Sequence, residues 1–258
     1  MRLLEALFNI FKAYLGYRRF AKQVRTQGPQ GMMYDALEKG DYQMAFEMGT
    51  NLNNNFVRGT ALMQLGVFDE AEKSLRRAVD TAKNPKLGAV ANVGLGELYL
   101  HQLRYEPALQ CFQSALILWP ERGSTNRAFA EVGLRRGDPP AEALRRARLA
   151  VESERAAPGL SPESKNANLS ENLATLAWAV AADSRDAAEV EKLCAEAAIP
   201  CSSSPVATKA QVHCHCGLAY ATLGDTVKSK RHFEEAERVD PNGIWGREAM
   251  SLAAGVPK

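Results

Sequence analysis

Three stretches of this 258-residue chain repeat one pattern of small and large side chains, and this repeat constrains the fold more than any other feature. In each stretch a turn precedes a small residue, a large apolar residue follows four positions later, and an alanine comes three positions after that. Spacings of three, four and seven belong to one face of a helix, so each stretch is predicted to be helical. The stretches are LGVFDEAEKSLRRAV from Leu65, QLRYEPALQCFQSAL from Gln102 and LGDTVKSKRHFEEAE from Leu223.

A glycine stands before the turn at the same point of each repeat. Glycine inside a helix costs up to about 1 kcal/mol relative to alanine, so its recurrence needs a packing reason. We expect a neighbouring helix backbone to come close at these positions, which are Gly59, Gly96 and Gly217. A proline follows the second helix of each pair, where a helix should stop. These prolines are Pro85, Pro120 and Pro241.

These residues resemble the tetratricopeptide repeat family, whose unit of about 34 residues is a helix–turn–helix with small residues at the tight contacts. The match is good over 52–85, 89–122 and 210–243, and weaker over 123–157. The segment 26–51 looks like a shortened first unit. The resemblance implies an all-α fold, a right-handed α-solenoid of tetratricopeptide-type helix pairs. The pattern of residues 1–25 adds an N-terminal amphipathic helix before it.

Residues that interrupt helices indicate where the solenoid divides. The Pro/Ser/Gly-rich segment Ala157–Asn166 is predicted to be a loop. We therefore expect a basic helix over 1–25, a stack of repeats over 26–156, and a second stack over 157–258. The second stack should hold a degenerate helix pair that turns at Asp183–Asp186, one good repeat and a C-terminal capping helix.

Charge and cysteine usage exclude several classes of protein. Residues 1–25 carry six basic side chains and one acidic, while the whole chain has a net charge of only +2, so the rest is close to neutral and no nucleic-acid partner is expected. The five cysteines are odd in number and scattered, so they do not indicate a set of disulfides. Free cysteines are typical of a reducing compartment, so we expect the protein in the cytoplasm. No apolar run reaches the ~18 residues of a membrane-spanning helix, and Glu5, Asn9 and Lys12 interrupt the amino terminus as a secretory signal.

The first 25 residues are predicted to form an attachment helix with a wide apolar side. Aromatic and aliphatic residues beside basic ones suit an anionic membrane surface, so a peripheral location at a membrane is one alternative. A partner protein and packing against the first repeat are the other two. The residues concerned are Leu4, Leu7, Phe8, Phe11, Tyr14, Leu15, Arg18 and Arg19.

By the resemblance, the first helices of successive pairs line a concave groove that binds a partner helix or peptide segment. The family's carboxylate clamp is absent, because Phe56 and Thr60 stand where it has Lys and Asn. In the alternative interpretation, Phe56, Val90 and Val93 only pack beneath the first unit. The predicted partner-binding residues are Phe56, Met63, Val90, Val93, Glu97, Leu100, Arg127 and Glu131.

The run His213–Cys216 is the one candidate for metal ligands. A structural zinc site needs four convergent ligands, whereas a helix would put only His213 and Cys216 on one face. His101 and His232 are expected on exposed helix faces, and no phosphate loop or nucleophile motif occurs. We therefore expect neither catalysis nor a cofactor. The sequence predicts an adaptor or assembly scaffold, with a membrane-associated structural subunit of a larger complex as the alternative.

Overall fold

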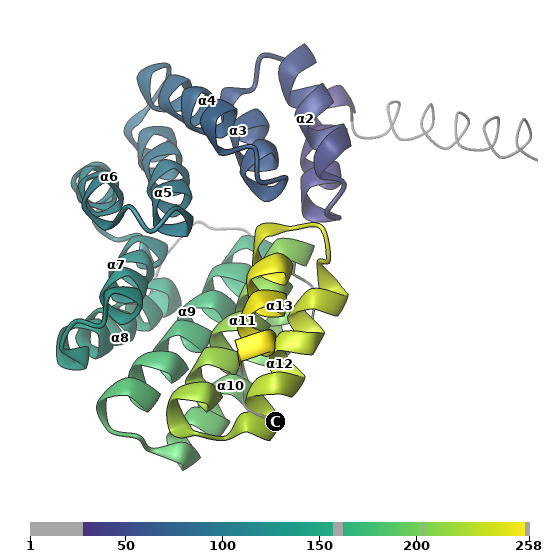
Figure 1. The fold of residues 1–258 in the computed structure, drawn as a ribbon. Coiled ribbons are helices and arrows are strands. Elements are labelled where there is room, and N and C mark those ends of the chain that lie inside the picture. Colours follow the sequence, from purple (N-terminus) through teal and green to yellow (C-terminus); the bar gives the residue numbers. More distant parts are fainter. Residues whose placement is uncertain (1–27, 157–161, 203, 256–258) are drawn as a thin grey trace, which may run out of the picture.

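The computed structural model describes residues 28–156, 162–202 and 204–255 (Figure 1). Every regular element in these ranges is a helix, which confirms the predicted all-α solenoid of helix pairs. The helix predicted over 1–25 lies outside the described residues. So does the start of the loop predicted at Ala157–Asn166, and the division of the chain at residue 157 stays a prediction.

The amino-terminal part is a run of antiparallel helix pairs. The first pair consists of the helical segment 28–38 and α2, so the shortened first unit is a complete helix pair. The following helices are α2 (Tyr42–Asn51), α3 (Asn55–Gln64), α4 (Phe68–Asp80), α5 (Pro85–His101), α6 (Tyr105–Leu118), α7 (Gly123–Arg136) and α8 (Pro140–Ala156).

The carboxy-terminal part contains the degenerate pair, the good repeat and the cap. The degenerate pair turns between Asp183 and Ala187, as expected. The loop expected up to Asn166 ends earlier, because Pro162 begins a helix, a position where proline's missing N–H costs nothing. The helices are α9 (Pro162–Asp183), α10 (Ala187–Cys201), α11 (Val206–Leu223), α12 (Thr226–Val239) and α13 (Ile244–Gly255).

Short polar side chains start several of these helices by accepting a hydrogen bond from a backbone N–H of the first turn. The carboxylate or amide oxygens of Asn54, Asn84 and Asp225 each lie within 3.0 Å of such a nitrogen. Glycine in a left-handed conformation ends two others, at Gly137 (φ 75°) and Gly224 (φ 84°). These helix boundaries therefore follow from local sequence signals.

The recurring glycines pack against the large side chain of the second helix in their own pair. A Cβ atom added at Gly96 would lie 2.3 Å from the Phe112 ring, and one added at Gly217 would lie 2.5 Å from the Phe233 ring. At Gly59 the added atom would meet the Leu75 side chain at 2.7 Å. The expected tight contact is confirmed. The Leu75 backbone nitrogen also lies 3.1 Å from the atom added at Gly59, as expected, whereas the nearest neighbours of Gly96 and Gly217 are side-chain rings and not helix backbone.

The solenoid curls until its two ends meet. Figure 1 shows α2 to α8 as an arc whose first helices reach the connection between α12 and α13. The Tyr42 hydroxyl donates a buried hydrogen bond of 2.5 Å to the Asp240 carboxylate, across 198 residues of sequence. One apolar cluster contains Leu62 of α3, Leu98 of α5 and Trp245 of α13. The inner face of the arc is therefore covered by the chain's own C-terminal helix.

We expect Gly96→Ala to destabilise the protein by about 1–3 kcal/mol, because the Phe112 ring fills the place of the new methyl group. Chemical denaturation measures the change. The matched control is Gly133→Ala in α7, where the added Cβ atom meets its nearest neighbour at an ordinary 3.7 Å, so the gain in helix propensity should leave stability equal or higher. Equal effects of the two substitutions would contradict the assigned contact.

Candidate interaction site on the concave face

The structure distributes the predicted partner-binding residues between the core and the inner surface. Buried side chains include those of Met63, Val93, Leu100, Arg127 and Glu131. The side chains of Phe56, Val90 and Glu97 are only half-buried. Met63 and Leu100 share a cluster with Ile244 and Trp245 of α13. Val93 lies in a separate cluster with Ala89 of its own helix and Ala115 of α6, so its burial does not depend on α13.

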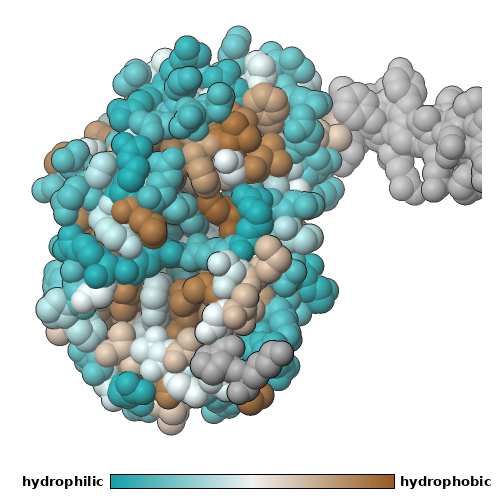
Figure 2. Space-filling view, in the orientation of Figure 1, coloured by the Kyte–Doolittle hydropathy of each residue, from teal (hydrophilic) through white to brown (hydrophobic). Residues whose placement is uncertain are grey.

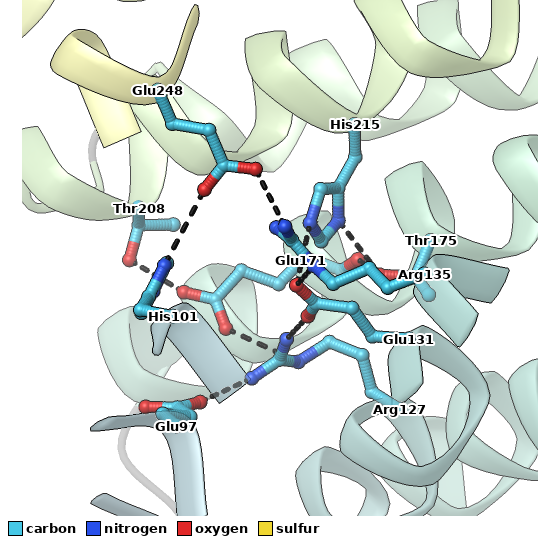
Figure 3. A network of polar contacts seen from close by, with 10 residues as sticks. All are labelled: Glu97, His101, Arg127, Glu131, Arg135, Glu171, Thr175, Thr208, His215 and Glu248. Atoms are coloured by element: carbon cyan, nitrogen blue, oxygen red, sulfur yellow. Dashed lines mark hydrogen bonds and ion pairs between the residues drawn. The ribbon is translucent and has the colours of Figure 1, made fainter. Parts of the chain in front are cut away.

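A buried guanidinium lies at the centre of the inner face (Figure 3). Arg127 of α7 donates to Glu97 of α5 at 2.6 Å and to Glu131, one turn along α7, at 3.0 Å. Its Nε atom lies 3.7 Å from a carboxylate oxygen of Glu171, which α9 supplies. Burial alone would lower the pKa of Arg127, but these carboxylates outweigh burial and raise it, so the charge is retained.

A second arginine extends the network to the C-terminal helix. Arg135 bonds Glu131 at 2.8 Å and Glu248 of α13 at 2.6 Å. The other oxygen of Glu248 lies 3.4 Å from Nδ1 of His101, at the end of α5. Burial would raise the pKa of Glu248, but the His101 hydrogen bond and the Arg135 charge outweigh it and lower the pKa to about 2.

Polar side chains of α9 and α11 complete the network from behind. His215 is fully buried, with Nδ1 2.9 Å from the Thr175 hydroxyl and Nε2 3.5 Å from Glu131. The Thr208 hydroxyl donates to Glu171 at 2.8 Å. The residues drawn in Figure 3 lie on α5, α7, α9, α11 and α13, and their side chains point toward one another. A buried charge that lost its partner here would be costly, typically by 3–5 kcal/mol.

Helix α13 makes its contacts with the arc through side chains and its first turn. The Trp245 ring packs edge-on against His101, with ring centroids 4.6 Å apart. The Ile244 backbone N–H donates to the Gln64 side chain at 3.0 Å, and the Arg247 guanidinium donates to the Gln64 carbonyl at 2.8 Å. Part of the inner face is thus covered by a helix of the chain itself, α13.

Sequence reasoning missed the residues that connect the arc to α13. His101 was expected on an exposed face, but its side chain is 5% exposed and points at Glu248. Arg135 and Glu248 were not predicted to be site residues, although Arg127, Glu131 and Arg135 follow one another at a spacing of four. Charges repeated at helical spacing on the face predicted to line the groove were a usable signal for an inward-facing network.

Of the histidine and cysteine run, His215 belongs to this network, whereas His213 and Cys216 face another part of the molecule. His213, Cys216 and His232 line a cavity of about 410 Å³ among α10, α11 and α12, with the two histidine Nδ1 atoms 3.1 Å apart. The expectation that His232 is exposed was therefore wrong. Burial, and then the neighbouring His213, lower the pKa of His232 to about 4. In the described part of the chain, no three His, Cys, Asp or Glu side chains are placed to hold a metal ion.

Among the described helices, none combines the length and the apolar character needed to cross a bilayer. The amino-terminal segment 1–25 falls outside that finding, so its attachment residues, Leu4 to Arg19, remain a prediction.

Comparison with known proteins shows which folds are similar to this one. A family model described as a tetratricopeptide repeat matches residues 53–85. A chain of the Cut9–Hcn1 hetero-tetramer of the APC/C superposes with a TM-score of 0.53 at 13% identity, covering 92% of this chain and 45% of that one. Yeast Tom70 gives 0.45 at 18% identity, with 83% and 42% covered. YrrB, a TPR protein with an unusual peptide-binding site, gives 0.37 at 18% identity, with 81% and 98% covered.

The chain therefore spans less than half of the length of the Cut9–Hcn1 and Tom70 chains. No curated protein matched the sequence. At 13% identity, the likeness to the Cut9–Hcn1 chain concerns the fold.

We expect the contribution of Glu248 to stability to disappear in acid. Its pKa lies below the ordinary 4.5, so the stabilisation is present above that value and is lost as the pH falls toward about 2. At pH 6 the free energy of unfolding of Glu248→Gln should lie below that of the unmodified protein by on the order of 2 kcal/mol. This difference between the two proteins should shrink as the pH falls from 4.5 toward about 2.

Urea unfolding at several pH values measures the gap. The matched control is Glu142→Gln, because the pKa of Glu142 is also about 2 but its side chain is 60% exposed to solvent beside Arg145 and Arg146. High salt should abolish the pH-dependent effect of Glu142→Gln and leave that of Glu248→Gln. A gap for Glu248→Gln that is constant from pH 6 to pH 2 would contradict the ion pair with Arg135.

Proposed function

Because this chain is a tetratricopeptide repeat protein, we propose that it is a non-enzymatic scaffold that binds a helix or peptide segment of another protein on its concave face. Stacked helix pairs present an extended concave surface, and such surfaces are used for binding in repeat proteins. The fold supports the class of function, protein–protein interaction, while the partner and the face that it contacts are our proposal.

One observation carries the proposal: three of the predicted partner-binding residues on α3 and α5 are not fully buried. Phe56 of α3 and Val90 and Glu97 of α5 are only half-buried, although the neighbouring Met63 and Leu100 are buried. Figure 2 shows apolar side chains gathered along a hollow between the α3–α5 side and the α13 side of the molecule. Because Glu97 is already paired with Arg127 at 2.6 Å, the apolar groups are what a partner would contact, and they suit the apolar face of an amphipathic helix.

A second proposal concerns attachment. Residues 1–25 combine large apolar side chains with six basic ones, a composition that suits either a partner subunit or an anionic membrane face. The scaffold would then be cytoplasmic and peripheral, held by Leu4, Phe8, Phe11 and Leu15. These four side chains are large enough to contribute about 1.5–3 kcal/mol each when fully buried.

Co-purification tests both proposals with one tagged full-length chain. Phe56→Asp and Val90→Asp should each remove the co-purifying protein, because a carboxylate would be buried against its apolar face, while the helical circular dichroism stays the same. Ile117→Asp is the matched control: Ile117 is 76% exposed on α6, so the same change should retain the partner.

Mass spectrometry identifies the proteins that co-purify with the chain, and vesicle flotation measures whether the chain binds a membrane. Deleting residues 1–25 should leave the repeats folded but release the chain from its partner subunit or membrane fraction. Unchanged capture by both aspartate variants would exclude the concave face as the binding surface. Unchanged attachment after the deletion would exclude the second proposal.

A further inference from the structure

The open cavity of about 410 Å³ among α10, α11 and α12 is separate from the concave face. None of its lining residues belongs to α3, α5 or α7, the helices on which a protein partner is proposed to bind. Its volume lies within the range of sites that hold small molecules. We call it the α11 cavity, because side chains of α11 run along it.

The buried lining residues form an apolar floor, although most of them are cysteines. They are Cys194, Cys201, Val212 and Cys216. Burial raises the pKa of the Cys201 thiol to about 11. A hydrogen bond with Cys194, together with burial, raises the pKa of the Cys216 thiol well above its ordinary value. These two thiols therefore stay protonated near pH 7, and an uncharged buried thiol packs as a small apolar group.

A pair of histidines adds polar but uncharged groups to the wall of the α11 cavity. The Nδ1 atoms of His213 and His232 lie 3.1 Å apart, so the two rings are hydrogen-bonded to each other. Burial lowers the pKa of both rings, that of His232 to about 4, so both are neutral near pH 7. One Nδ1 then donates and the other accepts. The pair therefore brings no charge to the cavity.

The charged side chains of the α11 cavity leave one cation unpaired. Glu235 and Arg238 bond each other through both carboxylate oxygens. Lys209 is half-buried, and its ammonium has no ion pair or hydrogen-bond partner in the part of the chain that the structure describes. Its charge lowers the pKa of Cys201 in opposition to burial, so the ammonium lies close to the floor. The cavity is thus complementary to a ligand with one negative charge.

We infer that the α11 cavity binds a small carboxylic acid with an aliphatic chain, its carboxylate on the Lys209 ammonium and its chain along Val212 toward Cys216. These three residues follow one another at spacings of three and four, so they share one face of α11 and span about 10 Å. The ligand therefore carries its charge at one end of an apolar chain of about this length. A carboxylate matches one lone ammonium, whereas a phosphate group, with a charge of about −2, would exceed it.

Octanoate is a direct probe, because its extended chain matches this span. Its titration into the full-length chain is followed by NMR of isotope-labelled valine methyl groups. We expect saturable shifts at Val206, Val212 and Val239, which line the cavity, and none at Val57, which is buried in a separate cluster of the first repeats. Octanol, the uncharged analogue, should bind about tenfold more weakly, since one charge-assisted hydrogen bond is worth at least that factor.

Two pairs of variants test the charge and the space separately. Lys209→Met should weaken octanoate binding about tenfold and leave octanol binding unchanged, because it removes only the charge. Its matched control is Lys192→Met, since Lys192 is exposed on α10 and does not line the cavity. Ala198→Trp should block both ligands, because Ala198 is an exposed lining residue that the larger ring extends into the cavity. Ala195→Trp, exposed on the same helix outside the cavity, should block neither.

Equal octanoate affinity of Lys209→Met and Lys192→Met would overturn the inference, and so would an absence of saturable shifts at the three valines of the cavity. A peptide that ends in leucine offers the same carboxylate from a different source. If it bound at these valines more tightly than octanoate, the occupant would be the C-terminus of another protein, and the assignment to a small acid would be wrong.

Discussion

The buried arginines of α7 are the feature on which the rest of the structure depends. Arg127 and Arg135 hold four carboxylates that come from α5, α7, α9 and α13, and no two of these helices are consecutive in the chain. Buried ion pairs of this kind add little net stability, but they penalise arrangements that separate the partners. The network therefore selects one curvature of the solenoid, the one that brings α13 onto the inner face.

Closure changes the role of a surface that usually faces solvent in an open solenoid. Met63 and Leu100, which would line an open groove, share an apolar cluster with Ile244 and Trp245. Phe56, Val90 and Glu97 stay half-buried, so they are the predicted partner-binding residues that a second protein could still contact.

The sequence predicted what depends on local spacing and missed what depends on long-range contact. The repeat marks Gly96 and Gly217, so the fold and the positions of the tight contacts could be predicted, but the Phe112 and Phe233 rings that make those contacts were not. The Tyr42–Asp240 bond could not, because 198 residues separate the partners and nothing in either repeat marks the curvature. His101 was assigned to the surface for the same reason: its helix face is exposed in a single repeat and covered only when α13 arrives.

The closed arc is the central claim, and a double-mutant cycle on Tyr42→Phe and Asp240→Asn tests it most directly. Urea unfolding of the two single variants and the double variant gives the coupling energy between the ends of the solenoid. A buried hydrogen bond to a carboxylate predicts a coupling of about 1 kcal/mol or more. A coupling of zero would mean that the ends do not meet, and would contradict the closure and the covered inner face together.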